Sequence, residues 1–184
     1  MRLFVAVLPP VDQLTYPLSV LSSQWKGGRW IPPESLHITL SFLGEIASAR
    51  QSAVEAIIEQ SVSTTPEFEA SFEGLGAFPS VRRPEVVWTG MTRGAEQLAL
   101  LAGYLKENFS KAGFFQEERT WKAHMTLARR RPGASSKGFL DFLKKNQVVS
   151  LGSFRVSSVS LMESKLSSAG SSYRILKTFP LQGP

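Results

Sequence analysis

The two histidines of the chain each open a four-residue phrase of the form His-x-Thr-Leu, at His37–Leu40 and again at His124–Leu127. No other histidine occurs among the 184 residues, and in both phrases threonine and leucine occupy the third and fourth positions. Both phrases lie in short runs of β-branched and apolar residues, which favour strands. Side chains at positions i and i+2 of a strand share a face. Each phrase is therefore predicted to present an imidazole and a hydroxyl on the same side.

Two imidazoles that face one cleft form an acid–base pair, because both titrate near neutral pH. One takes a proton from an attacking hydroxyl or water while the other protonates the leaving oxygen, and each such group accelerates a reaction by about 10²–10⁴. The hydroxyls of Thr39 and Thr126 can donate hydrogen bonds to anionic oxygens. Phosphoryl transfer needs this combination of placement, proton transfer and charge neutralisation. The phrases therefore predict chemistry on a strained phosphate ester, such as a cyclic phosphate.

Three arginines follow the second phrase. Arg129 is placed to supply fixed positive charge to a phosphate, and its plain alternative is a solvated arginine at the end of a strand. Simple alternation directs its side chain away from His124, unless the strand ends or bulges at Ala128. Arg130 and Arg131 are expected to be surface charges that add to the basic field.

Aromatic side chains flank both phrases. Phe42 is predicted to belong to the core rather than to stack on a base. The same expectation, core or lining of the cleft, applies to Trp30, Phe78, Trp88 and Trp121, although aromatics beside a basic cleft can stack on bases.

Other kinds of site are disfavoured. A catalytic metal requires three or four protein ligands, and no carboxylate lies at ligand spacing from the two histidines. The absence of cysteine excludes disulfides, thiol catalysis and zinc sites built on cysteine. The sequence also lacks a Gly-x-Ser-x-Gly elbow, a P-loop and a Rossmann glycine fingerprint. We therefore expect a reaction without metal or cofactor.

The composition is typical of a soluble globular protein, with 42% hydrophobic and 20% charged residues. The length suits one domain over residues 1–184, built from two closely fused lobes. The apolar run Leu3–Leu8 is too short for a signal sequence or a membrane span, and we interpret it as a buried strand. A net charge of +6 and a pI near 9.8 favour an anionic partner such as RNA or a nucleotide. The lack of cysteine fits the cytoplasm.

Apolar periodicity predicts a mixed α+β order that loosely repeats in the two halves. Helices are expected around 11–25, kinked or begun near Pro17, and around 48–61, 98–109 and 136–146. Strands are expected at 3–8, 35–43, 68–72, 86–88, 121–128, 154–161 and 173–179. Gly/Pro-rich connections at 74–79 and 82–84 and a Ser/Gly-rich loop at 167–172 join them.

The stretches Arg29–Gly44 (RWIPPESLHITLSFLG) and His124–Arg129 (HMTLAR) closely resemble the two signatures of the 2H phosphoesterase superfamily. Within it, they are most similar to the RNA 2′,3′-cyclic phosphodiesterase family, also called 2′-5′ RNA ligase. The resemblance covers nearly the whole chain, including RLFVA at 2–6, GLGAFP at 74–79 and the closing stretch at 173–181. Either phrase alone is unspecific, but the pair within these flanks is a strong match.

The resemblance implies an α+β fold of two pseudo-symmetric lobes, in which antiparallel sheets line a central groove and helices lie outside. It implies metal-independent hydrolysis of RNA 2′,3′-cyclic phosphate ends, tRNA fragments among them, to 2′-phosphomonoesters. Reversible 2′-5′ RNA ligation would be a further activity, and the protein would be a cytoplasmic monomer without a membrane partner. His37 would be the proton donor and His124 the proton acceptor, while Thr39, Thr126 and Arg129 would bind the phosphate.

Two other functions stay open. One is a 2H phosphodiesterase acting on a small cyclic nucleotide or on an ADP-ribose cyclic phosphate, and the other is a non-catalytic module that binds RNA ends. The residues alone also leave open which histidine is the acid, since the reaction is reversible. The sequence departs from the family pattern at Pro17 and at Lys122-Ala123, and the latter pair is expected to alter the entrance to the groove.

Overall fold

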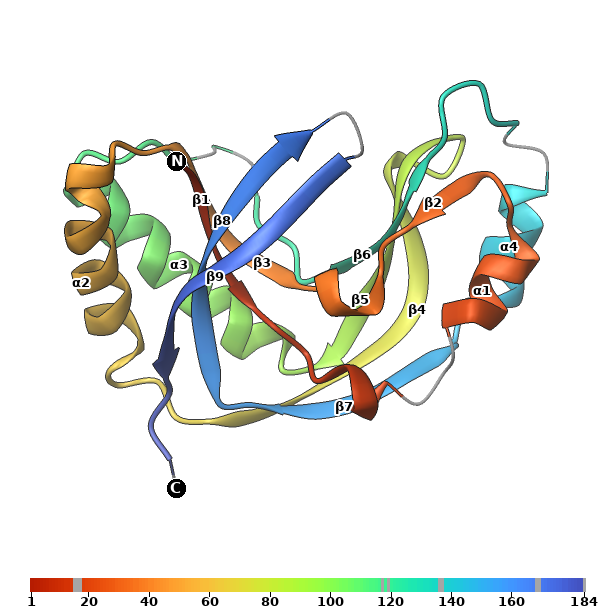
Figure 1. The fold of residues 1–184 in the computed structure, drawn as a ribbon. Coiled ribbons are helices and arrows are strands. Elements are labelled where there is room, and N and C mark those ends of the chain that lie inside the picture. Colours follow the sequence, from red (N-terminus) through yellow and green to blue (C-terminus); the bar gives the residue numbers. More distant parts are fainter. Residues whose placement is uncertain (15–17, 117, 119, 136–137, 168–169, 184) are drawn as a thin grey trace.

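Two antiparallel sheets form the centre of the computed structural model, with helices outside them (Figure 1). The structure describes residues 1–14, 18–116, 118, 120–135, 138–167 and 170–183. The predicted fold class, α+β with antiparallel sheets and external helices, is confirmed. No helix in this described part of the chain is both long and apolar enough to cross a bilayer.

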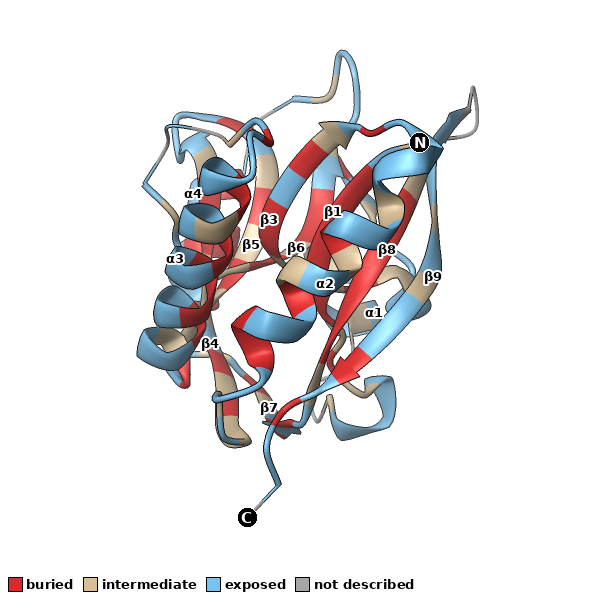
Figure 2. Ribbon diagram, turned by 90° about the vertical axis from the view of Figure 1, so that its left-hand side faces the viewer, coloured by how far each residue is buried: buried red, intermediate tan, exposed pale blue. Residues whose placement is uncertain are grey.

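The first sheet has the strand order β3-β1-β8-β9. Its strands are β1 (Arg2–Val7), β3 (Ile38–Glu45), β8 (Ser158–Ser167) and β9 (Gly170–Pro180), and the adjacent helices are α2 (Gln51–Val62) and α3 (Ala95–Lys111). These two helices pack on each other and against β9 and β3, which places them on one face of the sheet (Figure 2).

The central strand β1 is buried on both faces, as its unbroken apolar run predicts. Leu3, Val5 and Val7 belong to the main core, whereas Phe4 and Ala6 belong to a second, smaller apolar cluster. Because side chains alternate along a strand, this second cluster lies on the opposite face of the sheet from the main core.

The second sheet has the strand order β2-β6-β5-β4-β7. Its strands are β2 (Gly28–Trp30), β4 (Phe68–Ser80), β5 (Arg83–Arg93), β6 (Met125–Arg130) and β7 (Ser150–Val156), and the helices beside it are α1 (Leu18–Gln24) and α4 (Phe139–Lys145). Short 3-10 turns occur at η1 (Val11–Gln13), η2 (Pro33–Ser35) and η3 (Ser48–Arg50). Trp25, which follows α1, packs on Phe139 of α4 with 4.8 Å between the ring centroids, so the two short helices share one apolar cluster.

The prediction of a Gly/Pro-rich connection over 74–79 is wrong, because these residues continue β4. The ladder between β4 and β5 runs from Ser71 to Ser80, with register shifts that absorb the irregular residues. One of these is Gly74, whose φ of +70° suits glycine. Bulges thus allow a sequence rich in turn residues to stay in a strand.

The strand expected over 154–161 is in fact two strands in different sheets. β7 ends at Val156 and pairs with β4, whereas β8 begins at Ser158 and pairs with β1. The apolar pattern continues through the junction because both strands bury apolar residues, so the pattern gives no sign of the change. The short strand β2 was also not expected from its sequence.

Some expected elements start later or fall outside the described residues. The two histidine strands begin at Ile38 and Met125, each one residue after its histidine. The helix expected from 136 is described from Phe139, and residues 170–172 of the expected loop belong to β9. Pro17, residues 136–137 and residues 168–169 lie outside the part of the chain that the structure describes.

Candidate active site

The leucine of each phrase is the extra residue of a β-bulge. In β3, Thr39 pairs with Ala6 and Ser41 with Val5, which leaves Leu40 without a partner in the ladder. In β6, Thr126 pairs with Trp88 and Ala128 with Val87, which leaves Leu127 in the same position. Such bulges re-aim the side chains that follow them. The two copies of the phrase therefore share a backbone irregularity as well as a sequence.

His37 is half-buried in an aromatic pocket. Its ring lies 5.1 Å from that of Phe4 and 4.9 Å from that of Tyr173, measured between centroids. Its Nδ1 is 2.8 Å from the carbonyl oxygen of Ser35. Because a carbonyl oxygen only accepts, Nδ1 carries the proton, and in the neutral ring Nε2 keeps its lone pair.

His124 has the same backbone contact and a different aromatic pocket. Its Nδ1 donates to the carbonyl oxygen of Lys122 at 2.8 Å, and its ring lies edge-on to Phe78 at 5.1 Å and to Trp88 at 6.2 Å. The ammonium of Lys122 lies over the Trp88 ring at 4.2 Å. Both histidines are thus held in the tautomer that leaves Nε2 available for proton transfer.

Gly76 makes room for the aromatic wall beside His124. A Cβ added at Gly76 would lie 2.2 Å from a ring carbon of Trp88. Since Gly76 and Trp88 are opposite each other on β4 and β5, the absent side chain lets the indole lie flat across the neighbouring strand.

Both imidazoles have lowered pKa values. Burial lowers the pKa of His37 below 6.5, its hydrogen bond to Ser35 opposes this, and the charges of Arg129 and His124 lower it further. Burial also lowers the pKa of His124, with the charge of Lys122 as a smaller cause. His37 is thus affected by the charges of His124 and of Arg129, which both lie in the region of the second phrase.

A hydrogen bond joins the segment before the second phrase to the first phrase. The indole Nε1 of Trp121, three residues before His124, donates to the carbonyl oxygen of Thr39 at 2.9 Å. A second bond runs from the hydroxyl of Ser41 to the side-chain oxygen of Gln116, also at 2.9 Å. The segment that leads into the second phrase is thereby fixed to the strand that carries the first.

Arg129 lies on the side of the sheet that carries His124, because of the bulge at Leu127. Arg129 pairs with Val86, and Val86 shares a face with Trp88, the residue that contacts His124. Regular alternation would have placed Arg129 on the other face. The sequence allowed Arg129 to face His124 only if the strand ended or bulged at Ala128. The strand does bulge, with Leu127 as the extra residue, one position before Ala128.

Two expectations about the neighbours are wrong. Phe42 is not in the core: it is 46% exposed and lies 5.9 Å from the Phe4 ring that packs on His37. A bulge at Leu40 turns it to that face. Arg130 is not a free surface charge, because it donates to Glu85 at 2.8 Å and to the carbonyl of Ala134 at 3.0 Å.

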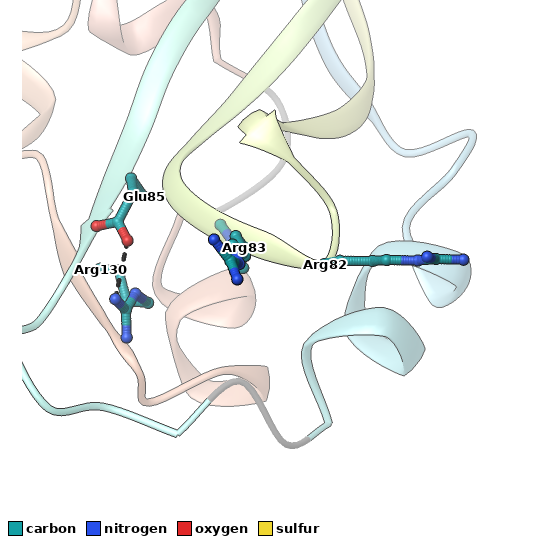
Figure 3. A pocket seen from close by; sticks show the side chains of 5 residues that line it. Arg82, Arg83, Glu85 and Arg130 are labelled. Atoms are coloured by element: carbon teal, nitrogen blue, oxygen red, sulfur yellow. Dashed lines mark hydrogen bonds and ion pairs between the residues drawn. The ribbon is translucent and has the colours of Figure 1, made fainter.

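The Arg130–Glu85 pair belongs to a basic pocket at the tip of the β4–β5 hairpin (Figure 3). The pocket has a volume of about 240 Å³ and is lined by Arg82, Arg83, Pro84, Glu85 and Arg130. None of the predicted site residues lines it, so it is separate from the histidine site.

The aromatic residues that pack on the histidines were only partly found from the sequence. Phe78 and Trp88 were expected to line the core or the cleft, but Phe4 and Tyr173 had no assigned role. They come from β1 and β9, and only the sheet order β3-β1-β8-β9 brings them beside His37. In the described residues, no group of three histidine or acidic side chains is placed to hold a metal ion.

A pair of histidine–threonine strands contributed by two antiparallel sheets defines the 2H phosphoesterase class of protein. The sequence pattern of the 2′-5′ RNA ligase superfamily matches residues 9–167, and the chain belongs to this family.

Known relatives match over most of the chain. An Archaeoglobus fulgidus protein named RNA 2′,3′-cyclic phosphodiesterase is 34% identical, over 97% of this chain and 99% of its own. An Aquifex aeolicus protein of the same name is 31% identical, over 85% of this chain and 83% of its own. Among solved structures, TT0787 of Thermus thermophilus has a TM-score of 0.79 at 28% identity, over 100% of this chain and 99% of its own. Escherichia coli LigT complexed with 3′-AMP has a TM-score of 0.78 at 26% identity, over 98% and 97%.

Proposed function

We propose that this protein hydrolyses RNA 2′,3′-cyclic phosphate ends to 2′-phosphomonoesters, with its two histidines as acid and base. The observation that carries the proposal is the matched pair of imidazoles, each oriented through Nδ1 so that Nε2 is available for proton transfer. The names of the relatives in A. fulgidus and A. aeolicus support this choice of substrate.

In the proposed reaction, water attacks the phosphorus atom, the bond from phosphorus to O3′ breaks, and the phosphate stays on O2′. His124 accepts the proton of the attacking water, and His37 gives a proton to the leaving O3′. Thr39 and Thr126 donate hydrogen bonds to the non-bridging oxygens, and Arg129 offsets their negative charge. Exchange with solvent then restores the starting protonation states.

Substrate binding would generate the acid. In the free protein, burial and the charges of Arg129 and His124 lower the pKa of His37, which favours the neutral ring. A phosphate anion bound beside His37 offsets these charges and favours the imidazolium. Binding of a nucleoside 2′-phosphate at pH 7 should therefore take up a proton, which calorimetry in buffers of different ionisation enthalpy would detect.

The direct test uses purified protein in excess chelator with an oligonucleotide that ends in a 2′,3′-cyclic phosphate. We expect a 2′-phosphate as the only product. A mixture of 2′- and 3′-phosphates, or dependence on added metal, would contradict the mechanism. Binding of the cyclic end without turnover would instead identify an RNA-end binding module.

The two proton-transfer roles can be separated with a substrate in which sulfur replaces O3′. A thiolate leaves without protonation, so the loss caused by removing the acid should shrink on this substrate, whereas the loss caused by removing the base should persist. We expect His37→Ala to be rescued and His124→Ala not to be. The opposite pattern would exchange the roles.

The same site accounts for the other family expectations. An RNA 5′-hydroxyl in the place of water would give a 2′-5′ linkage, which is the ligation reaction. We extend the proposal to tRNA fragments with cyclic ends and to a monomer working in the cytoplasm. Light scattering after size-exclusion chromatography would test the oligomeric state.

A further inference from the structure

Arg29 of β2 lies directly opposite Arg129 of β6. The amide of Ile31 donates to Leu127 at 2.8 Å, and the amide of Arg131 donates to Gly27 at 2.9 Å. These bonds flank the arginine pair two residues to either side, so Arg29 and Arg129 are themselves a hydrogen-bonded pair, with Cα atoms about 5.5 Å apart. Directly opposite residues share a face of the sheet.

Neither of these two guanidinium groups makes a hydrogen bond or ion pair with another side chain of the described residues, and Arg29 and Arg129 are both exposed. The neighbouring Arg130 differs, because Glu85 neutralises it (Figure 3). Like charges directly opposite each other on adjacent strands are destabilising. An anion between or beside the two arginines would remove this repulsion.

The arginine pair continues the row of side chains that begins beside His124. Across the sheet, Arg29 pairs with Arg129, Arg129 with Val86, and Val86 with Phe78, whose ring packs on His124. No carboxylate occurs in this row. Each step across the sheet is about 4.8 Å, so Arg29 lies one strand farther from His124 than Arg129 does.

The two arginines are therefore placed for two different phosphates. Arg129 lies on β6, on the face that carries His124, which places it beside the reacting phosphate of the proposed reaction, and its charge also lowers the pKa of His37. Arg29 lies on β2, the edge strand of the sheet, beyond Arg129. A guanidinium group there can bind a phosphodiester through two parallel hydrogen bonds.

We propose that Arg29 binds the phosphodiester that joins the terminal nucleotide to the rest of the RNA, and so makes the site prefer cyclic ends on RNA to cyclic mononucleotides. This inference rests on the proposed function. It assigns Arg29 to substrate selection rather than to the chemical step.

The test compares two substrates that differ by one phosphate. A nucleoside 2′,3′-cyclic phosphate has only the reacting group, whereas a dinucleotide with the same cyclic end adds one internucleotide phosphate. We expect Arg29→Gln to lower kcat/KM for the dinucleotide by about tenfold or more, mainly through KM, and to leave the mononucleotide within about twofold. The salt dependence of dinucleotide binding should also become shallower.

Arg82→Gln is the matched control, because it removes the same charge from the hairpin pocket and should change neither substrate. Arg29→Lys should recover part of the preference, since lysine keeps the charge but not the planar fork. Because Arg29→Gln relieves a repulsion, its Tm should equal or exceed that of the wild type, which separates a binding defect from misfolding.

An equal loss on both substrates, or no loss on either, would overturn the assignment. If the wild type turns over neither substrate, the proposed function fails by itself. The inference is then decided by affinity: Arg29→Gln should weaken binding of a dinucleotide 2′-phosphate and not of a nucleoside 2′-phosphate. The absence of that difference in affinity would overturn it in the same way.

Discussion

In both histidine phrases the ring donates from Nδ1 to the carbonyl two residues earlier, and in both the leucine is the extra residue of a bulge. The bulge brings the fifth residue after each histidine to the face that carries the histidine. In the first phrase that residue is Phe42, and in the second it is Arg129. The same backbone geometry thus presents an aromatic ring beside the first histidine and a cation beside the second.

This difference shows that the two halves of the site are not interchangeable. The charge of Arg129, which follows the second phrase on β6, lowers the pKa of His37 in the first phrase, whereas the charge acting on His124 is that of its own neighbour Lys122. The second phrase therefore influences the protonation of the first. An anion bound at Arg129 would change the state of His37 before that of His124.

The largest expected effect tests whether either phrase works alone. His37→Ala and His124→Ala should each lower the rate of cyclic phosphate opening by about 10²–10⁴. The double variant should lose little more than the worse single variant, because the residues act as a unit. Initial rates would measure this, with circular dichroism and Tm to verify folding; near-native turnover by either single variant would contradict the paired mechanism.

The next effect tests the difference between Phe42 and Arg129. In the proposed mechanism, Arg129→Gln removes a charge-assisted contact worth about 1.5–3 kcal/mol, which corresponds to roughly a 10- to 150-fold loss in kcat/KM. It should also raise the pKa of His37 and leave that of His124 unchanged, as followed by NMR titration of the two ring protons. A shift in the pKa of His124 and not of His37 would contradict this, because it would show that Arg129 acts on the histidine next to its own strand. Phe42→Gln is the control, since it changes the matching residue without removing a charge.

A smaller effect tests the aromatic wall beside His124. In Gly76→Ala the new Cβ would meet the Trp88 ring at 2.2 Å, and such overpacking costs about 1–3 kcal/mol. Urea unfolding should show this loss, and turnover should fall because the indole that packs on His124 is displaced.

Gly103→Ala provides the control for the same substitution. Gly103 lies in α3, where an added Cβ meets nothing within 4 Å. Alanine at this helical position should stabilise the protein by about 0.5–1 kcal/mol and leave turnover unchanged. If Gly76→Ala behaved like Gly103→Ala, the proposed packing against Trp88 would be wrong.

The smallest effect is a dependence of stability on pH that both histidines share. Their pKa values are lowered below 6.5 in the folded state, so on acidification the unfolded chain takes up protons first. The free energy of unfolding should therefore fall as the pH drops below about 6.5. Glu55, whose pKa is lowered from 4.5 chiefly by its hydrogen bond to Gln51, loses its contribution only at lower pH.

Urea unfolding between about pH 7.5 and 5 would isolate the histidine contribution. Replacing either histidine with glutamine should flatten the dependence. A wild-type protein equally stable throughout this range would show that burial does not hold the rings neutral.

The sequence predicted the reacting groups and much of the scaffold. The repeated phrase identified His37 and His124 before any fold was known, and the apolar run of β1 predicted a strand buried on both faces. Local patterns carry this information because they depend on the period of a strand or helix. They also supported the α+β class.

The tertiary structure decided which residues surround those groups. Alternation alone misplaces Arg129 and Phe42, because a bulge is fixed by pairing with a neighbouring strand and leaves no sign in the strand's own sequence. The break between β7 and β8 is hidden for a similar reason. Both strands bury apolar side chains, each in a different sheet, so the apolar pattern runs on without interruption. Arg29 became significant only through its partner across β2 and β6. The sequence thus placed two histidines in matching His-x-Thr-Leu phrases and predicted their chemistry, while contacts between distant strands decided which charge and which aromatic rings each histidine meets.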